Sequence, residues 1–352
     1  MHSKDLITLK DAEGYIDITS VMENTKLTYD TPTMKQSFVT EDNVRVFWKP
    51  CEPNSFSHFG EVIVSHLARQ FNLPSTKYFF AKYKGVRGTI SRDYKKTTET
   101  ELLGRDFLID YYKEAYNDFK YITKHEEFNN IVFIKEALSY YVKGDKNKSN
   151  PKQFSITKED AEKAFEKILL NYMLDIVVLN PDCHHKNWGL LVDNSSENIK
   201  VRNIPCVDKE RSFFLYLPQQ KLLSWVQDYY EQPIQENLKK MQAVFKENSK
   251  KCTPAFNILP EGEEYGGLGK PYLESMQELK TIFPNTFERL LEKFYHFNLS
   301  KAFDSVERET GVKVPKLVKL IAMNAYETRY FEVKERFGAV KEMQEEDKNL
   351  LF

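Results

Sequence analysis

The densest group of chemically active side chains in this sequence is the segment Asn-Pro-Asp-Cys-His-His-Lys-Asn-Trp-Gly at residues 180–189. Within it, Asp182 and Asn187 are five residues apart, and Asp208 follows Asn187 after twenty-one residues. Protein kinases use a carboxylate and an asparagine at this spacing as the base for the acceptor hydroxyl and as a magnesium ligand. A second carboxylate completes such a metal site, because Mg²⁺ is a hard ion that takes oxygen ligands. The spacing indicates phosphoryl transfer, with Asp182 as base and with Asn187 and Asp208 as metal ligands.

A purely structural interpretation of residues 180–187 is equally open on this evidence, because Asp, Asn and Pro are common in turns that follow helices. Two residues earlier in the chain favour the kinase interpretation. Lys49 ends the alternating segment Val44–Lys49, and Glu61 lies in the first turn of the next predicted helix. In kinases, a strand lysine and a helix glutamate form the ion pair that positions the α- and β-phosphates. Each residue alone is more often a surface residue, but their order along the chain is that of a nucleotide kinase.

The elements that must position these residues fall into two groups, which meet near Tyr94. Before it, short alternating segments bounded by turn residues predict a small, mostly antiparallel sheet. The expected strands are Tyr15–Val21, Ser37–Thr40, Val44–Lys49, Lys77–Tyr83 and Val86–Ser91. A single helix, His58–Phe71, interrupts them, with apolar residues at helical spacing and with Asn72 and Pro74 closing it.

After Tyr94 the pattern becomes mainly helical. Helices are expected at Glu101–Phe119, at Phe128–Lys143, at Lys158–Leu179 behind a capping box of Thr157 and Asp160, and again from Gln219 onward, with strand-like pieces at Gly189–Val192 and Lys200–Val207. The expected fold class is therefore α+β. Residues 1–93 would form a sheet-rich N-lobe, and residues 94–352 a larger helical C-lobe that carries the catalytic loop 180–189 and Asp208.

Composition and charge limit the classes of function. The 352 residues are 41% hydrophobic and 14% aromatic, which is enough to fill a large core. Lys plus Arg (51) nearly balances Asp plus Glu (52), so no direct nucleic-acid contact is expected from the overall charge. The cysteines are far apart, without a Cys-x-x-Cys pair: Cys51, Cys183, Cys206 and Cys252. Without an apolar run of membrane-spanning length, we expect no membrane insertion and a cytoplasmic location, although a secreted effector stays open.

Residues 180–187 resemble the pattern Asn-x-Asp-x-His-x-Lys-Asn of the bacterial HipA-like serine/threonine kinases. This family includes the shorter CtkA-like members and shares its core with phosphatidylinositol 3/4-kinases. Residues Glu61–Pro74 are similar to the family's helix that ends in Leu-Ala-x-x-x-Gly-Leu-Pro, and Ile90–Tyr94 is similar to its hinge. The resemblance covers about Thr31 to Tyr216 and favours the short form of the family.

The resemblance implies a two-lobed protein-kinase-like fold and an ATP- and Mg²⁺-dependent transfer to Ser or Thr hydroxyls of a protein. It gives His184 a contact with the transferred phosphate, beside the roles of Asp182 and Lys49. The hinge backbone of Ile90, Ser91 and Arg92 would hold the adenine. Family members of this kind act as toxins or effectors, so an antitoxin or other regulatory partner is expected. Lys209 and Glu210 follow Asp208 in place of an Asp-Phe-Gly triplet, which tells against a eukaryotic-type kinase.

The weakest match is the expected phosphate loop, Thr-Pro-Thr-Met-Lys-Gln-Ser at residues 31–37, because it contains no glycine. Lys35 would help its backbone amides to bind phosphate. The same stretch could instead be a flexible loop in which Thr33 or Ser37 is autophosphorylated.

Two other functions stay open at this point. The glycine-free phosphate loop would suit a pseudokinase, that is, a nucleotide-binding module for a partner protein. A kinase of the same fold could also act on a lipid or a small molecule, since the fold alone does not fix the substrate.

Overall fold

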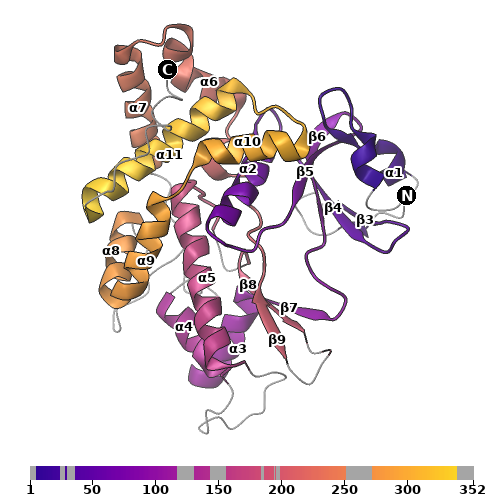
Figure 1. Cartoon of the computed structure of the whole chain (residues 1–352), viewed down its shortest axis with the longest axis vertical. Helices are drawn as coiled ribbons and strands as arrows, with labels where there is room; N and C mark the ends of the chain where they lie inside the picture. Colours follow the sequence, from indigo (N-terminus) through magenta and orange to yellow (C-terminus); the bar gives the residue numbers. More distant parts are fainter. Residues whose placement is uncertain are drawn as a thin grey trace.

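The computed structural model describes most of the chain. The described ranges are 5–23, 28–29, 36–116, 131–142, 156–183, 186–193, 195, 199–250 and 272–338. They form two lobes, a smaller one rich in strands and a larger one built mainly from helices (Figure 1). The expected two-lobed α+β architecture is confirmed.

The smaller lobe contains a six-stranded sheet in the order β1-β5-β6-β4-β3-β2. Its strands are β1 (Ile16–Asp17), β2 (Thr28–Tyr29), β3 (Gln36–Val39), β4 (Arg45–Pro50), β5 (Tyr78–Tyr83) and β6 (Val86–Arg92). Neighbouring strands are antiparallel, except that β1 and β5 are parallel. This is the mostly antiparallel sheet that the alternating segments predict.

The two faces of this sheet have different neighbours. Val46 and Trp48 of β4 pack with Ile90 of β6 in an apolar cluster that also includes Leu6 and Met22. These last two come from the N-terminal elements η1 (Asp5–Leu9) and α1 (Thr19–Glu23), which therefore cover this face. Because successive side chains of a strand point to opposite faces, Lys49 of β4 lies on the other face, toward α2 (Ser57–Gln70).

Helix α2 lies between the sheet and the helical lobe (Figure 1). Its residues from Ser57 to Ala68 are all buried, because β5 and β6 pack on one side of it and α10 (Leu299–Thr310) packs on another. The predicted span, His58–Phe71, is displaced by one residue at each end. A helix buried on all sides is a fixed part of the interior and suits the placement of a catalytic side chain.

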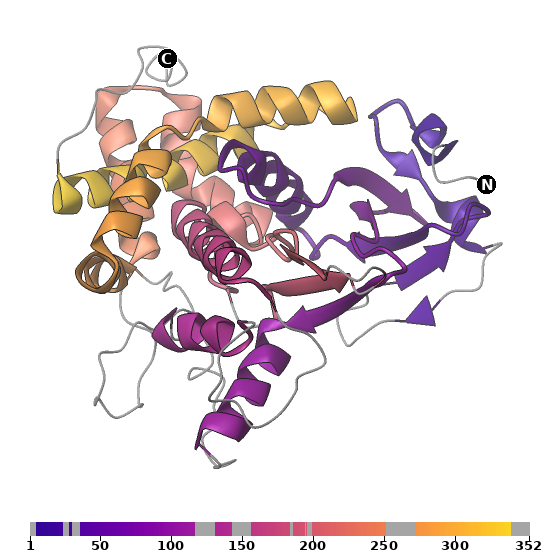
Figure 2. The ribbon, with the colours of Figure 1, turned by 60° about the horizontal axis from the view of Figure 1, so that its bottom comes forward.

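A second, three-stranded sheet lies between the six-stranded sheet and the helices α3 to α5 (Figure 2). It consists of β7 (Glu99–Leu103), β8 (Gly189–Asp193) and β9 (Lys200–Asn203), all antiparallel. The helices of the larger lobe are α3 (Gly104–Tyr116), α4 (Ile131–Tyr140), α5 (Lys158–Val177), α6 (Gln219–Glu231), α7 (Gln235–Ser249), α8 (Tyr272–Ile282), α9 (Pro284–Tyr295), α10 and α11 (Lys316–Phe337). The predicted capping box begins α5: the amide of Asp160 donates to Thr157 Oγ1.

Three predicted segments differ from the structure. Of Tyr15–Val21, only two residues are strand, because Asp17 accepts from the Thr19 amide and the chain turns into α1. The predicted helix Glu101–Phe119 begins as strand β7, which pairs with β8. The predicted strand Lys200–Val207 ends at Asn203, shortly before Pro205, which cannot donate to a ladder.

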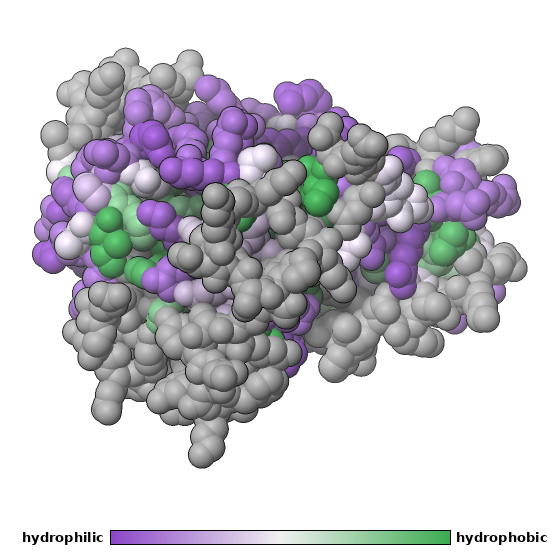
Figure 3. All heavy atoms as spheres, turned by 90° about the horizontal axis from the view of Figure 1, so that it is seen from below, coloured by the Kyte–Doolittle hydropathy of each residue, from purple (hydrophilic) through white to green (hydrophobic). Residues whose placement is uncertain are grey.

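The polarity of the surface and the cysteines of the described residues are those of an ordinary globular protein. The face seen in Figure 3 carries hydrophilic side chains over most of its described area and hydrophobic ones only in small separate patches. Among the described helices, none combines the length and the apolar character needed to cross a bilayer. The three described cysteines, Cys51, Cys183 and Cys206, are free thiols.

Candidate active site

The Lys49 side chain meets three carboxylates at the junction of the two lobes. Its Nζ lies 3.2 Å from Glu61 Oε2, 3.0 Å from Asp208 Oδ1 and 2.5 Å from Glu210 Oε2. Glu61 comes from α2, whereas Asp208 and Glu210 follow β9 in the helical lobe. The structure thus brings together the predicted lysine, helix glutamate and metal-binding aspartate, although they are far apart in sequence.

Burial strengthens the interactions in this cluster. Glu61 is only 2% exposed, while Lys49, Asp208 and Glu210 are between 17% and 28% exposed. Burial disfavours the Lys49 ammonium, but the surrounding carboxylates outweigh it and raise the pKa of Lys49. Burial raises the pKa of Glu61 to about 7 against the opposing effect of Lys49, and the charges of Glu210 and Asp208 add to the rise. The single ammonium of Lys49 therefore forms ion pairs with three acidic side chains.

A polar cluster holds the end of β4 against the start of α2. Cys51 Sγ lies 3.0 Å from His58 Nδ1 and 3.3 Å from Ser57 Oγ, and the Tyr15 hydroxyl lies 3.1 Å from His58 Nε2. Burial lowers the pKa of His58 to about 3, so its imidazole is neutral and adds no charge beside Lys49. These contacts fix the register between the strand that carries Lys49 and the helix that carries Glu61.

Gly60 lets α2 approach the segment that carries Asp208 and Glu210. A Cβ atom at Gly60 would lie 2.9 Å from the carbonyl oxygen of Glu210 and 3.2 Å from that of Lys209. Any larger residue there would push the helix and this segment apart. This close approach allows Oε1 of the neighbouring Glu61 to accept a hydrogen bond from the backbone amide of Lys209 at 3.3 Å.

The backbone at Asp208 has a left-handed conformation with φ of 55°. Non-glycine residues adopt this region rarely, and Asp does so more readily than most. Such conformations occur mainly where the surrounding structure fixes them, often at functional sites. Here the conformation turns the chain after Cys206 so that the Asp208 carboxylate reaches Lys49.

The predicted catalytic loop follows the end of α5. Its backbone is shaped by its own amides: the Asp182 amide donates to Asn180 Oδ1 at 3.2 Å, and Asn187 Nδ2 donates to the Asp182 carbonyl at 2.7 Å. Asn180 and Asn187 are 2% and 1% exposed, whereas the Asp182 residue is partly accessible. Asp182 is therefore a partly accessible residue of a loop whose two asparagines are buried.

A buried ion pair joins this loop to the segment of Asp208. Lys209 Nζ lies 2.6 and 2.8 Å from the two carboxylate oxygens of Asp175 on α5, and both side chains are almost fully buried. Asp175 Oδ1 also accepts from Asn180 Nδ2 at 2.8 Å. Burial alone would lower the pKa of Lys209, but the Asp175 carboxylate raises it, so Lys209 is charged.

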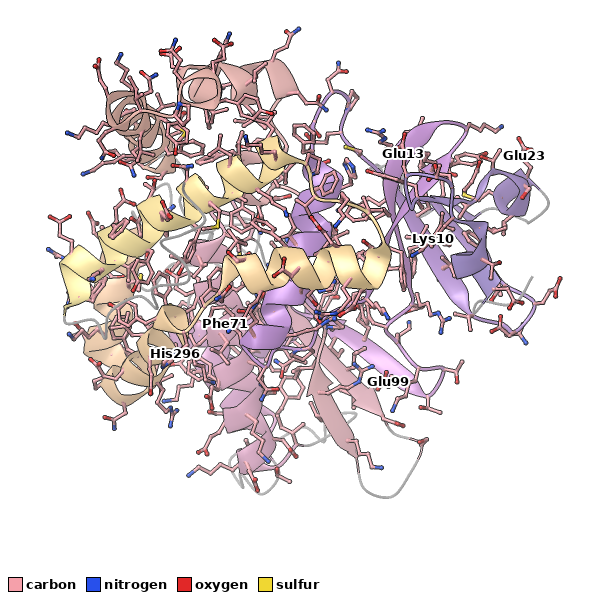
Figure 4. The ribbon with its side chains drawn as sticks, turned by 45° about the horizontal axis from the view of Figure 1, so that its top comes forward. Lys10, Glu13, Glu23, Phe71, Glu99 and His296 are labelled. Atoms are coloured by element: carbon pink, nitrogen blue, oxygen red, sulfur yellow. The ribbon has the colours of Figure 1, made fainter. Side chains whose placement is uncertain are left out.

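The predicted hinge residues Ile90, Ser91 and Arg92 lie in β6, which pairs with β4 beside Lys49. The chain after β6 is tied to the small sheet, because Arg202 Nη2 donates to the Tyr94 carbonyl at 2.7 Å. Arg202 also pairs with Glu99 of β7 at 2.7 Å, and Figure 4 shows Glu99 on this sheet. The assignment of the hinge backbone to adenine stays a prediction.

A cavity of about 410 Å³ lies beside this hinge. Its lining includes Val46, Ile90 and Leu6 from the apolar cluster under the N-terminal segment, together with Ser91 to Tyr94. Lys49, Glu61 and Asp208 do not line it. It lies toward the face of the sheet opposite Lys49 and is separate from the carboxylate cluster.

Two predicted site residues lie outside the described part of the chain, namely His184 and Lys35, and so does Thr33. Ser37 is among the described residues, and the structure corrects its predicted placement. It lies in β3, is completely buried, and its Oγ accepts a hydrogen bond from Arg45 Nε at 3.1 Å. The expectation that Ser37 lies in a flexible loop was wrong, because Ser37 is a buried residue of β3. Its autophosphorylation stays a prediction.

The oxygen donors of the site fit a hard divalent cation. Glu61, Asp208 and Glu210 each offer a carboxylate oxygen, and these oxygens lie within 4.8 Å of one another. Asn187 Oδ1 is buried and has no hydrogen-bond partner among the described residues, which suits an oxygen that a ligand would complete. Asn187 and Cys206, two residues before Asp208, line the same small cavity, so their two segments lie side by side.

Three residues of the site were not predicted: Glu210, Lys209 and Asp175. Lys209 and Glu210 directly follow Asp208, and they were noted only as a departure from another kinase type. Asp175 carried a usable signal, because a carboxylate inside the apolar pattern of α5 must be buried and must therefore be paired. The partner of Asp175 could not be read from the sequence.

No protein-family model and no curated protein matches this chain. Among solved structures, the Helicobacter pylori proinflammatory kinase CtkA aligns with a TM-score of 0.54 at 13% identity, over 90% of this chain and 95% of CtkA. HipA of Shewanella oneidensis MR-1, from its toxin–antitoxin complex with HipB and operator DNA, gives a TM-score of 0.45 at 8% identity, over 87% and 62% of the two chains. The Golgi casein kinase with Mn/ADP bound gives 0.35 at 11% identity, over 96% and 77%. At these identities the likeness to CtkA concerns the fold. This chain has the two-lobed fold of the CtkA-like atypical kinases.

Proposed function

We propose that this protein is an ATP- and Mg²⁺-dependent kinase that transfers the γ-phosphate to a Ser or Thr hydroxyl of a protein. The observation that carries the proposal is the convergence of Lys49, Glu61 and Asp208 at one point between the lobes. In kinases a strand lysine held by a helix glutamate positions the nucleotide phosphates, and a nearby aspartate binds the metal. The CtkA-like fold supports the same function.

In this proposal each residue has a defined task. Lys49, held by Glu61, donates hydrogen bonds to the α- and β-phosphates. Asn187 and Asp208 would hold Mg²⁺, which when bound neutralises the charge that develops on the phosphates. Asp182, on its partly accessible loop, accepts the proton of the attacking hydroxyl. His184 is proposed to contact the transferred phosphate, and Lys35 to support the phosphates from the other side.

The test is transfer of labelled phosphate from Mg·ATP in the native chain and in matched variants. Asp182→Asn should lower the transfer rate by about 10²- to 10⁴-fold while nucleotide affinity is kept, because only the base is lost. Asp208→Asn should weaken the binding of Mg·ATP itself. Glu307→Gln changes a carboxylate that pairs with Lys313 and Lys319 instead of Lys49, so it serves as a control variant and should transfer phosphate like the native chain. Equal labelling in all four proteins would refute the assignment of the site.

The acceptors in the assay separate the proposed function from its alternatives. Labelling of protein but not of inositol lipid or sugar supports a protein kinase, and the opposite result identifies a kinase for lipids or small molecules. Binding of Mg·ADP without transfer to any acceptor identifies a pseudokinase. A regulatory partner, such as an antitoxin, would be sought by co-purification with the native chain.

A further inference from the structure

Lys209 has contacts in two directions, and together they connect the two halves of the site. Its backbone amide donates to Glu61 Oε1 at 3.3 Å, on the side of Lys49. Its side chain reaches the opposite way into the helical lobe and binds both oxygens of Asp175. The residue immediately before it is Asp208. Lys209 thus connects the cluster of Lys49, Glu61 and Asp208 to the interior of the helical lobe.

From Asp175 the chain of contacts continues to the catalytic loop. Asp175 Oδ1 accepts from Asn180 Nδ2, and Asn180 Oδ1 in turn accepts from the amide of Asp182. Asn187 closes the loop by donating to the Asp182 carbonyl. Every link is between 2.6 and 3.2 Å, and all the side chains involved are almost fully buried.

Stability alone is a weak explanation for such a pair. A buried ion pair often contributes no more to stability than apolar residues of the same volume, because both ions lose their hydration. A buried lysine that is hydrogen-bonded to both oxygens of a buried carboxylate does, in contrast, hold two chain segments together. Here those segments are the one that carries Asp208 and the one that carries Asp182.

We infer that Lys209 and Asp175 are positioning residues that couple the occupancy of the metal and nucleotide site at Asp208 to the placement of the base Asp182. Neither residue touches the reacting atoms. A change at Asp208 moves Lys209, and Lys209 acts on the loop through Asp175 and Asn180. This inference rests on the proposed function for its account of turnover, but the coupling itself is measurable without turnover.

The test uses the double variant Lys209→Met/Asp175→Asn, which removes both charges and leaves an oxygen at position 175 for Asn180. Its folding is checked by circular dichroism and thermal unfolding, and Glu307→Gln serves as a variant whose stability changes without a change at the site. The first measurement is amide hydrogen exchange of the catalytic loop with and without Mg·ADP. In the native chain Mg·ADP should slow exchange at Asp182 and Asn187 by about tenfold or more, and in the double variant by less than about threefold.

The second measurement separates binding from turnover. Calorimetric affinity for Mg·ADP should change by less than about threefold in the double variant, while the rate of phosphate transfer falls by about 100-fold, as expected for a misplaced base. Equal loop protection in the two proteins would overturn the inference, and so would a loss of affinity that accounts for the whole loss of rate. Protection without transfer in the native chain would refute the proposed function but support the coupling. If the native chain does not bind Mg·ADP, both fail.

Discussion

Lys49 Nζ lies closer to Glu210 Oε2, at 2.5 Å, than to its predicted partner Glu61 or to the predicted metal ligand Asp208. In the proposed function, nucleotide phosphates would require hydrogen bonds from this same ammonium. The ammonium donates hydrogen bonds to Glu61 and Asp208, and its ion pair with Glu210 is the shortest of its three contacts. Nucleotide phosphates would therefore compete with these carboxylates for the ammonium, and Glu210 is the one that neither orients Lys49 from α2 nor belongs to the predicted metal ligands.

Replacing Glu210 with Gln should therefore strengthen nucleotide binding. The variant removes a competing charge of the same sign as the phosphates, so we expect the Kd for Mg·ADP to fall by about tenfold, which corresponds to about 1.4 kcal/mol. Titration calorimetry measures this directly. Glu52→Gln is the matched control, because Glu52 is an exposed acid that pairs loosely with Arg211 at 3.7 Å. Weaker binding in Glu210→Gln would mean that Glu210 is a metal ligand instead of a competitor.

Gly60→Ala should destabilise the protein, although helix propensity alone predicts the opposite. Ala is better than Gly in a helix by about 1 kcal/mol. The added methyl, however, would meet two backbone carbonyl groups, which cannot move like the end of a side chain. Such overpacking costs about 1–3 kcal/mol, so we expect a lower Tm and weaker binding of Mg·ADP. Gly60→Ser should show a larger effect of the same sign, and a rise in Tm for either variant would contradict this account.

The sequence predicted the parts of the site that follow local rules. Alternation placed Lys49 in β4, helical spacing placed Glu61 in α2, and the family pattern marked Asp182, Asn187 and Asp208. The link between Lys209 and Asp175 could not be predicted in the same way, because it joins residues thirty-four positions apart on segments whose approach depends on the whole lobe. Glu210 was missed for the same reason.

Strand β7 shows the same limit for the fold. Glu99–Leu103 contains Glu and Leu, which favour helices, and the local sequence therefore predicted a helix. Pairing with β8, more than eighty residues later, overrides this preference. Long, strongly periodic segments such as α5 were predicted well because their buried stripe is visible in the sequence, whereas short strands that depend on distant partners are not.

Glu307 should stabilise the fold at neutral pH and lose this contribution in acid. Burial tends to raise its pKa, but Lys313, Lys319 and the Val314 amide outweigh burial and lower the pKa to about 2. A folded pKa below the unfolded value of 4.5 means that the contribution is complete above about pH 4.5 and is lost as the pH falls toward 2. We expect Glu307→Gln to lower the free energy of unfolding at pH 7 by on the order of 2 kcal/mol.

Urea unfolding at pH 7 and in acid measures this difference. The gap between native and Glu307→Gln proteins should narrow as the pH falls below about 4.5. Glu274→Gln, at an exposed position of α8, should show no comparable gap. A gap that stays constant down to pH 3 would show that the carboxylate charge of Glu307 is not its source.

Glu61 should make both stability and activity depend on pH near neutrality, in opposite directions. Burial raises its pKa to about 7, Lys49 opposes the rise, and Glu210 and Asp208 add to it. Between pH 4.5 and 7 the folded state therefore holds a proton that the unfolded state has lost, so ionising Glu61 reduces stability as the pH rises through this window. Only ionised Glu61 attracts the Lys49 ammonium by charge, so in the proposed function the transfer rate should rise over the same window.

Stability and kcat/KM measured at matched pH values test this, and Glu61→Gln should remove both trends because Gln does not titrate. A rate that still rises near pH 7 in Glu61→Gln would assign the titration to another group.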